Sequence, residues 1–204
     1  MVQRILVSTL VALFVLFGTT AARAADDQTA QTFIQGLAQN AIATVAAQNV
    51  SDTDRNERFR KIFVSAFDIP EIGKFVLSRH WRAVTPAQQA AFLKEFEDTQ
   101  VLMWSRRFKD YNGVSLETLG ANKEGEATWL VDSQIIRPQA PPISVQWRVH
   151  GAADGSMRVI DIISSGISMV LTYRDDYASA LKLNGGNVDA LLAVMRAKNE
   201  RRVL

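Results

Sequence analysis

The chain has 204 residues, a formal net charge of +2 and no cysteine. One domain of this length can bury most of its apolar surface. Without cysteine it has neither a disulfide nor a thiol nucleophile. Its two histidines leave few possible sites for soft metal ions. A near-neutral charge also disfavours nucleic-acid binding, which depends on neutralising phosphates.

The first residues predict a secretory signal peptide. Arg4 lies in a short basic segment, residues 5–17 are apolar, and Ala22-Arg23-Ala24 has the A-x-A form of a cleavage site. The apolar run is shorter than the roughly 20 residues that a membrane-spanning helix needs. We therefore expect residues 1–24 to be removed and residues 25–204 to form one soluble domain in the periplasm. Without residues 1–24 the chain has a formal net charge of zero.

Helical periodicity dominates the chain up to Gly113. Helices are expected over residues 30–48 and 52–67, and Asp68 and Pro70 indicate the start of another. Residues 85–88, Thr-Pro-Ala-Gln, form a capping box that opens a long helix to about Lys109. The aromatic residues of this helix are four or eight positions apart and are interpreted as core packing in preference to a ligand wall: Phe92, Phe96, Trp104 and Phe108.

After Gly113 the apolar period changes to two, which predicts β-strands. The expected strands cover residues 114–120, 126–137, 143–150 and 158–163. The last of them is apolar on both faces, is interrupted at Ser164-Ser165-Gly166 and is expected to resume over residues 167–171. Two further helices are expected, over residues 174–183 and after Asn187. The order predicts an α+β fold in which helices pack on an antiparallel sheet of about four strands.

Motifs for nucleotide binding, serine hydrolysis or zinc catalysis are absent from the sequence. The one candidate for acid–base chemistry is Asp161, a carboxylate between Ile160 and Ile162, where burial would raise its pKa. The favoured interpretation is that Asp161 is hydrogen-bonded or paired with an arginine. Basic residues near the end of the long helix, Arg106, Arg107 and Lys109, are interpreted as solvated, with a lipid headgroup phosphate as the alternative partner.

Three segments together carry a resemblance to a known family. They are "FDIPEIGKFVLSRHWRAVTPAQQAAFLKEF", "VIDIISSGISMVLTYRDDYASAL" and "NGGNVDALLAVMRAKN", and their best markers are the capping box at Thr85, the run Gln146-Trp147-Arg148, and Asp161 followed by Gly166-Ile167-Ser168-Met169. The sequence resembles the MlaC/toluene-tolerance family of periplasmic phospholipid carriers, a branch of which accompanies hopanoid biosynthesis.

The resemblance implies a curled sheet under helices, in a nuclear-transport-factor-like arrangement that encloses an apolar lipid cavity. Gly166 would form a bulge near the mouth. The expected cavity residues are Phe75, Val76, Phe96, Trp104, Val131, Ile135, Val145, Trp147, Ile160, Ile162, Ile167 and Val170. Tyr173, Arg174 and Asp175 would dock on partner proteins.

The family also implies the partners. The cavity would take the tails of one or two diacyl lipids, and the monomeric carrier would exchange them between an outer-membrane lipoprotein/porin complex and an inner-membrane ABC transporter with an MCE-domain ring. No enzyme activity, metal or cofactor is expected. Two other hypotheses stay open: a small-molecule enzyme with Asp161 as base and Tyr173 or Tyr177 as acid, and an adaptor with a filled core. A carrier of hopanoid or another lipid is a variant of the phospholipid-carrier hypothesis.

Overall fold

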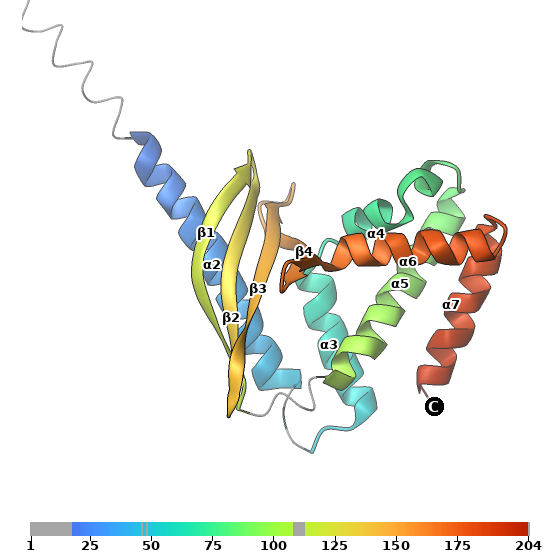
Figure 1. The fold of residues 1–204 in the computed structure, drawn as a ribbon, viewed down its shortest axis with the longest axis horizontal. Coiled ribbons are helices and arrows are strands. Elements are labelled where there is room, and N and C mark those ends of the chain that lie inside the picture. Colours follow the sequence, from blue (N-terminus) through green and yellow to red (C-terminus); the bar gives the residue numbers. More distant parts are fainter. Residues whose placement is uncertain (1–17, 46, 48, 108–112, 204) are drawn as a thin grey trace, which may run out of the picture.

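A computed structural model describes residues 18–45, 47, 49–107 and 113–203 of the chain. Most of the predicted apolar signal segment and Phe108 and Lys109 lie outside these residues. The described part is an α+β fold of six α-helices, one short 3₁₀ helix and five strands. Figure 1 shows the sheet on one side of the molecule and most helices on the other, with α2 running along the sheet.

The helices before the sheet begin where the sequence supplies caps. They are α2 (Gly18–Val45), α3 (Asp52–Ala66), α4 (Ile69–Leu77), the 3₁₀ helix η1 (Ser78–Arg82) and α5 (Pro86–Arg107). Asp68 accepts a hydrogen bond from the Glu71 amide at 3.0 Å, which starts α4. In the capping box, the Gln88 amide donates to Thr85 Oγ1 at 3.2 Å and the Thr85 amide donates to Gln88 Oε1 at 3.0 Å. The predicted cleavage site after Ala24 falls within α2.

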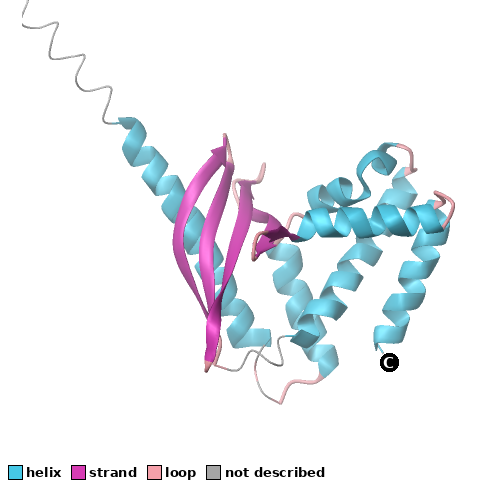
Figure 2. Ribbon diagram, viewed as in Figure 1, coloured by secondary structure: helices cyan, strands magenta, loops and turns pink. Residues whose placement is uncertain are grey.

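The sheet has five antiparallel strands in sequence order, against the four or so that were expected. They are β1 (Ser115–Gly125), β2 (Thr128–Arg137), β3 (Ala140–Gly151), β4 (Met157–Ser164) and β5 (Ile167–Ser168). Figure 2 shows the first three as long, bowed strands and β4 leading into the helical part. The additional strand β5 is only two residues long and pairs with the end of β4.

The connection between β4 and β5 corrects two expectations. Ser165 and Gly166 both have positive φ angles, 51° and 80°, and form a two-residue hairpin turn instead of a bulge. The strand expected over residues 167–171 ends at Ser168, because α6 (Met169–Leu183) begins there, five residues earlier than expected. The Ser168 hydroxyl caps α6 by accepting a hydrogen bond from the Leu171 amide at 3.2 Å.

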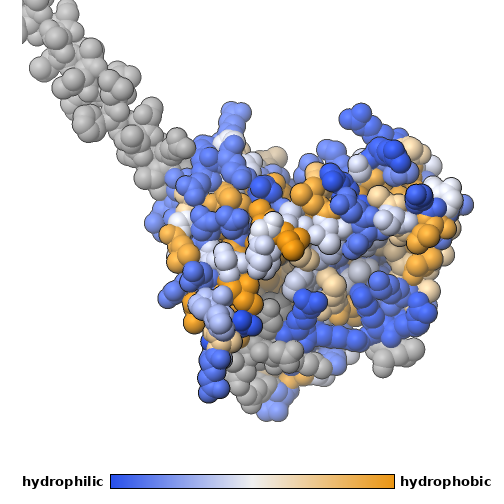
Figure 3. All heavy atoms as spheres, viewed as in Figure 1, coloured by the Kyte–Doolittle hydropathy of each residue, from blue (hydrophilic) through white to orange (hydrophobic). Residues whose placement is uncertain are grey.

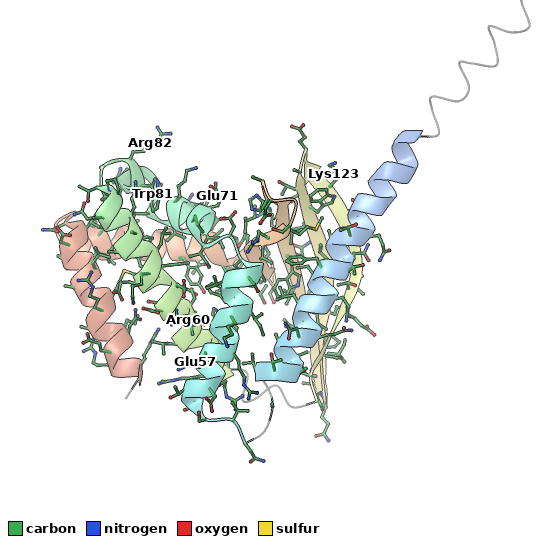
Figure 4. All side chains as sticks on the ribbon, turned by 180° about the vertical axis from the view of Figure 1, so that it is seen from behind. Glu57, Arg60, Glu71, Trp81, Arg82 and Lys123 are labelled. Carbon is green, nitrogen blue, oxygen red and sulfur yellow. The ribbon has the colours of Figure 1, made fainter. Side chains whose placement is uncertain are left out.

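The helix α7 (Val188–Val203) completes the fold. Gly185 and Gly186 have positive φ angles, 65° and 75°, and the Gly186 amide donates to the Leu181 carbonyl at 2.8 Å, so that the chain turns sharply between α6 and α7. On the outer side of the helices, Arg60 of α3 pairs with Glu97 and Asp98 of α5. Figure 4 shows Arg60 on the face of the molecule opposite to that of Figure 1.

The buried side chains form two separate cores. One joins the end of α2 and the helices α3, α4, α5, α6 and α7 around Phe92 and Phe96. The other joins α2 to the inner face of the sheet around Ile34, Val131 and Val149. Leu37 of α2 and Phe67 at the end of α3 pack against both cores. The fold therefore has an internal boundary, called the seam below, between the core under the sheet and the core among the helices.

Candidate functional site

A cavity of about 340 Å³ lies along this seam. Its wall is formed by α2, α3, α4, α5, the start of α6 and the strands β1 to β4, and it includes Phe residues at positions 59, 63, 67 and 96. Figure 3 shows apolar side chains at the surface between the two halves of the molecule. The cavity falls within the size range of small-molecule pockets, about 300–1,000 Å³, and its wall is almost entirely apolar.

The indole N–H groups of the two wall tryptophans are hydrogen-bonded within the protein. Trp147 Nε1 donates to Ser133 Oγ at 2.9 Å, and Ser133 Oγ donates to the Val145 carbonyl at 2.7 Å. Trp104 Nε1 donates to Tyr173 Oη at 3.3 Å, and burial raises the pKa of the Tyr173 phenol. Because these donors are satisfied within the protein, the tryptophan rings present an apolar surface to the cavity.

Asp161 is the acidic residue of the wall and is held by three donors. Its side chain is only 2% exposed, and its Oδ2 accepts hydrogen bonds from Arg148 Nη1 at 3.0 Å and Ser168 Oγ at 2.7 Å. Its Oδ1 accepts one from the Val170 amide at 3.2 Å. The prediction that Asp161 is paired with an arginine is confirmed. This pairing compensates the burial of the charge and fixes the first turn of α6 against the sheet.

Seven of the twelve expected cavity residues lie on this wall. They are Phe96, Trp104, Ile135, Val145, Trp147, Ile162 and Val170. Val76 and Val131 lie in the two cores instead, and Ile160 is half-buried outside the cavity. Phe75 and Ile167 are on the surface, 42% and 63% exposed. Ile167 is exposed because it follows the hairpin turn directly, at the edge of the sheet.

Of the three expected docking residues, one lies on the cavity wall and two lie outside it. Tyr173 lies on the cavity wall, with its ring edge against Phe96 at 5.9 Å between centroids. Arg174 and Asp175 point outward: Arg174 Nε lies 3.4 Å from Asp175 Oδ1, and the Arg174 guanidinium lies 5.5 Å from the centroid of the Phe75 ring. The early start of α6 causes this division, because consecutive residues of a helix face different sides.

Part of the wall was missed by sequence reasoning. α2 contributes Leu37, Ala38, Ala41 and Ile42, and α3 contributes Phe59 and Ile62. These residues lie on helices that were expected from their apolar period, but no role was assigned to them. Periodicity identifies the inward face of a helix but does not distinguish a filled core from a cavity wall.

The chain is similar to known proteins over most of its length. The family model described as "MlaC protein" matches residues 35–197. Among solved structures, the chain is similar to the phospholipid-binding protein from Ralstonia solanacearum, solved in complex with a phospholipid. That match has a TM-score of 0.76 at 17% identity and covers 85% of this chain and 98% of the other. At this identity the structural match shows a shared fold.

Within the part of the chain that the structure describes, no helix has the length and hydropathy needed to cross a bilayer.

Proposed function

Because the chain belongs to the MlaC family, we propose that it is a soluble periplasmic carrier that holds the acyl tails of a phospholipid in its cavity and moves the lipid between the two membranes. The observation that carries the proposal is the apolar cavity between the sheet and the helices. The phospholipid bound to the Ralstonia protein of the same fold supports it.

The physical need for such a carrier follows from the chemistry of its cargo. Each methylene group moved from a bilayer into water costs about 0.8 kcal/mol, so the spontaneous release of a diacyl lipid is very slow. A protein that covers the tails with an apolar wall lowers this barrier without a catalytic group. The wall contains Trp104 and Trp147, whose N–H groups are already bonded within the protein, and so offers the tails contact without competing polar donors.

The proposed partners follow from the family rather than from a site in the structure. We propose that the carrier exchanges lipid with an outer-membrane lipoprotein/porin complex and with an inner-membrane ABC transporter that bears an MCE-domain ring. Arg174 and Asp175 remain the proposed contact residues, since both are on the surface near the cavity wall formed by α6. Mixed charges suit transient contacts that are guided by electrostatics.

The geometry does not favour the enzyme hypothesis. A general base needs a lone pair directed at its substrate, whereas both oxygens of Asp161 accept hydrogen bonds from the protein. Among the residues that the structure describes, the phenol of the proposed acid Tyr173 is bonded to Trp104 and not to Asp161. The cavity also disfavours the adaptor hypothesis, because an adaptor needs no internal volume.

Transfer between vesicles tests the proposal. Donor vesicles with a fluorescent phospholipid and acceptor vesicles without it are mixed with the purified protein and then separated. We expect the protein to carry the label to the acceptor vesicles at a rate that rises with its concentration. A rate equal to that of the vesicles alone would reject the carrier function and leave the adaptor hypothesis standing.

A further inference from the structure

One arginine stands out on the apolar wall of the cavity. Arg107 is the last residue of α5, and among the described residues that line the cavity it is the only basic one. Trp104, another residue of the wall, lies beside it. A cation at this position is unexpected for a wall that contacts only acyl tails, which offer no anion.

The Arg107 guanidinium is placed by an aromatic ring. Its Cζ atom lies over the Trp104 ring, 4.8 Å from the centroid. The indole is itself fixed by the hydrogen bond from its Nε1 to Tyr173 Oη at 3.3 Å. A guanidinium that contacts an aromatic face keeps N–H donors at its edge, and their planar arrangement matches two oxygens of a phosphate.

The cavity wall contains a second charged side chain, Asp161, whose charge is compensated within the protein. The Asp161 carboxylate is buried and accepts three hydrogen bonds from Arg148, Ser168 and the Val170 amide. Arg107 is exposed to solvent at the end of its helix. The wall therefore offers a bound lipid one cation at a solvent-exposed position and an otherwise apolar interior. This distribution matches a phospholipid, which has an anionic headgroup and apolar tails.

We propose that Arg107 binds the phosphodiester of the carried lipid and thereby selects phosphorylated lipids over uncharged lipids with the same tails. This inference rests on the proposed carrier function and adds to it a residue that determines specificity. Trp104 acts as a positioning residue, because its ring directs the guanidinium. The recognised chemistry is a phosphate monoanion joined to two apolar chains.

A structural role for Arg107 alone must be separated from this one. Basic residues in the last turn of a helix interact favourably with its C-terminal carbonyl groups, and both Arg106 and Arg107 occupy that turn of α5. Arg106 is also exposed but is not part of the cavity wall. Arg106→Gln is therefore a matched control that removes the same charge from the same helix end.

The test measures which lipid the protein extracts. Lipid-free wild type, Arg107→Gln and Arg106→Gln are incubated with vesicles that contain phosphatidylglycerol and diacylglycerol with identical oleoyl tails. The bound lipids are then quantified by mass spectrometry. We expect Arg107→Gln to lower the ratio of bound phosphatidylglycerol to diacylglycerol about three- to fivefold, the size of an exposed ion pair, and Arg106→Gln to leave the ratio as in wild type.

The outcomes separate this inference from the carrier function. An unchanged ratio in Arg107→Gln, with normal total lipid, would overturn the inference and leave the carrier intact, whereas the absence of both lipids from wild type would reject the carrier itself. Equal reductions in both variants would also overturn it, since net charge alone would then explain the effect. A further arm adds inorganic phosphate to the lipid-free protein and follows it by phosphorus NMR. Line broadening that requires Arg107, without any lipid preference, would identify a free-phosphate site and contradict the headgroup assignment.

Discussion

Arg148 and Asp161 are direct cross-strand partners on β3 and β4, and their side chains are joined by an ion pair of 3.0 Å. Through the same carboxylate, the pair also holds Ser168 and the Val170 amide at the start of α6. One buried acid thus connects the sheet to the helix whose first turns, with Val170 and Tyr173, form part of the cavity wall.

Removing this acid is expected to lower stability. Asp161→Ala loses the bonds to Arg148, Ser168 and the Val170 amide, and we expect the free energy of unfolding to fall by about 2–4 kcal/mol. Denaturant unfolding measures the change. Glu124→Gln is the control: it alters the more exposed partner of Arg148 and should cost less than about 1 kcal/mol. Equal stability of Asp161→Ala and wild type would show that the network contributes nothing.

A charge on the cavity wall is expected to prevent lipid binding. Ile135 lines the cavity from β2, and Ile135→Glu would place a carboxylate against the tails at a cost of several kcal/mol. Bound lipid should be lost while circular dichroism stays close to wild type.

Ile167→Glu provides the matched control, because Ile167 is an exposed isoleucine outside the cavity. It should retain its lipid. Loss of lipid in this variant, or its retention in Ile135→Glu, would contradict the position of the wall.

Alkaline pH is expected to destabilise the helical core through Tyr177. Its ring contacts Phe92 edge-on at 5.4 Å, and burial raises the pKa of its phenol above the ordinary value of 10.0. Above about pH 10 the unfolded chain loses the proton while the folded chain keeps it, so stability falls as the pH rises.

The comparison of wild type with Tyr177→Phe isolates this effect. In urea unfolding at about pH 8 and about pH 11, the difference in stability between the two proteins should shift toward the phenylalanine variant at the higher pH. A difference that is the same at both pH values would mean that Tyr177 ionises equally in both states.

Reversal of a surface charge tests the proposed docking surface. Arg174→Glu changes a partly exposed residue of α6 that is not on the cavity wall. We expect slower lipid transfer to the MCE-domain ring at low salt, a smaller difference at high salt, and unchanged lipid binding. Lys182→Glu, an exposed reversal farther along α6, should transfer normally. If both variants match wild type at low salt, the docking surface lies elsewhere.

The fold class follows from local patterns, whereas the expected wall residues came from the resemblance to the MlaC family. The period of two placed Ile135 on one face of β2 and Val145 and Trp147 together on one face of β3, and the capping box at Thr85 located α5. The start of α6 was misplaced because Val170 and Leu171 have the β-branched and apolar character of a strand. The Ser168 cap is local, but Asp161 accepts hydrogen bonds from Ser168 and the Val170 amide across the β4–β5 turn, a contact that sequence patterns do not show.

The division between core and cavity could not be predicted in the same way. Ala41 and Phe59 lie on the inward stripes of α2 and α3, and the empty volume beside them depends on how far the sheet stands from the helical part. That separation is set by the packing of two cores that share only a few residues, such as Leu37 and Phe67. The sequence pattern of each element is the same whether the space between them is filled or open.

The mass of the purified, untreated protein under native conditions is the most direct test of the central claim that the cavity holds a lipid. We expect a species heavier than the chain by one or two phospholipids, and the released molecules should be identified as diacyl phospholipids in a solvent extract. A protein that has only the mass of its own chain, and that takes up no phospholipid when incubated with vesicles, would contradict the claim.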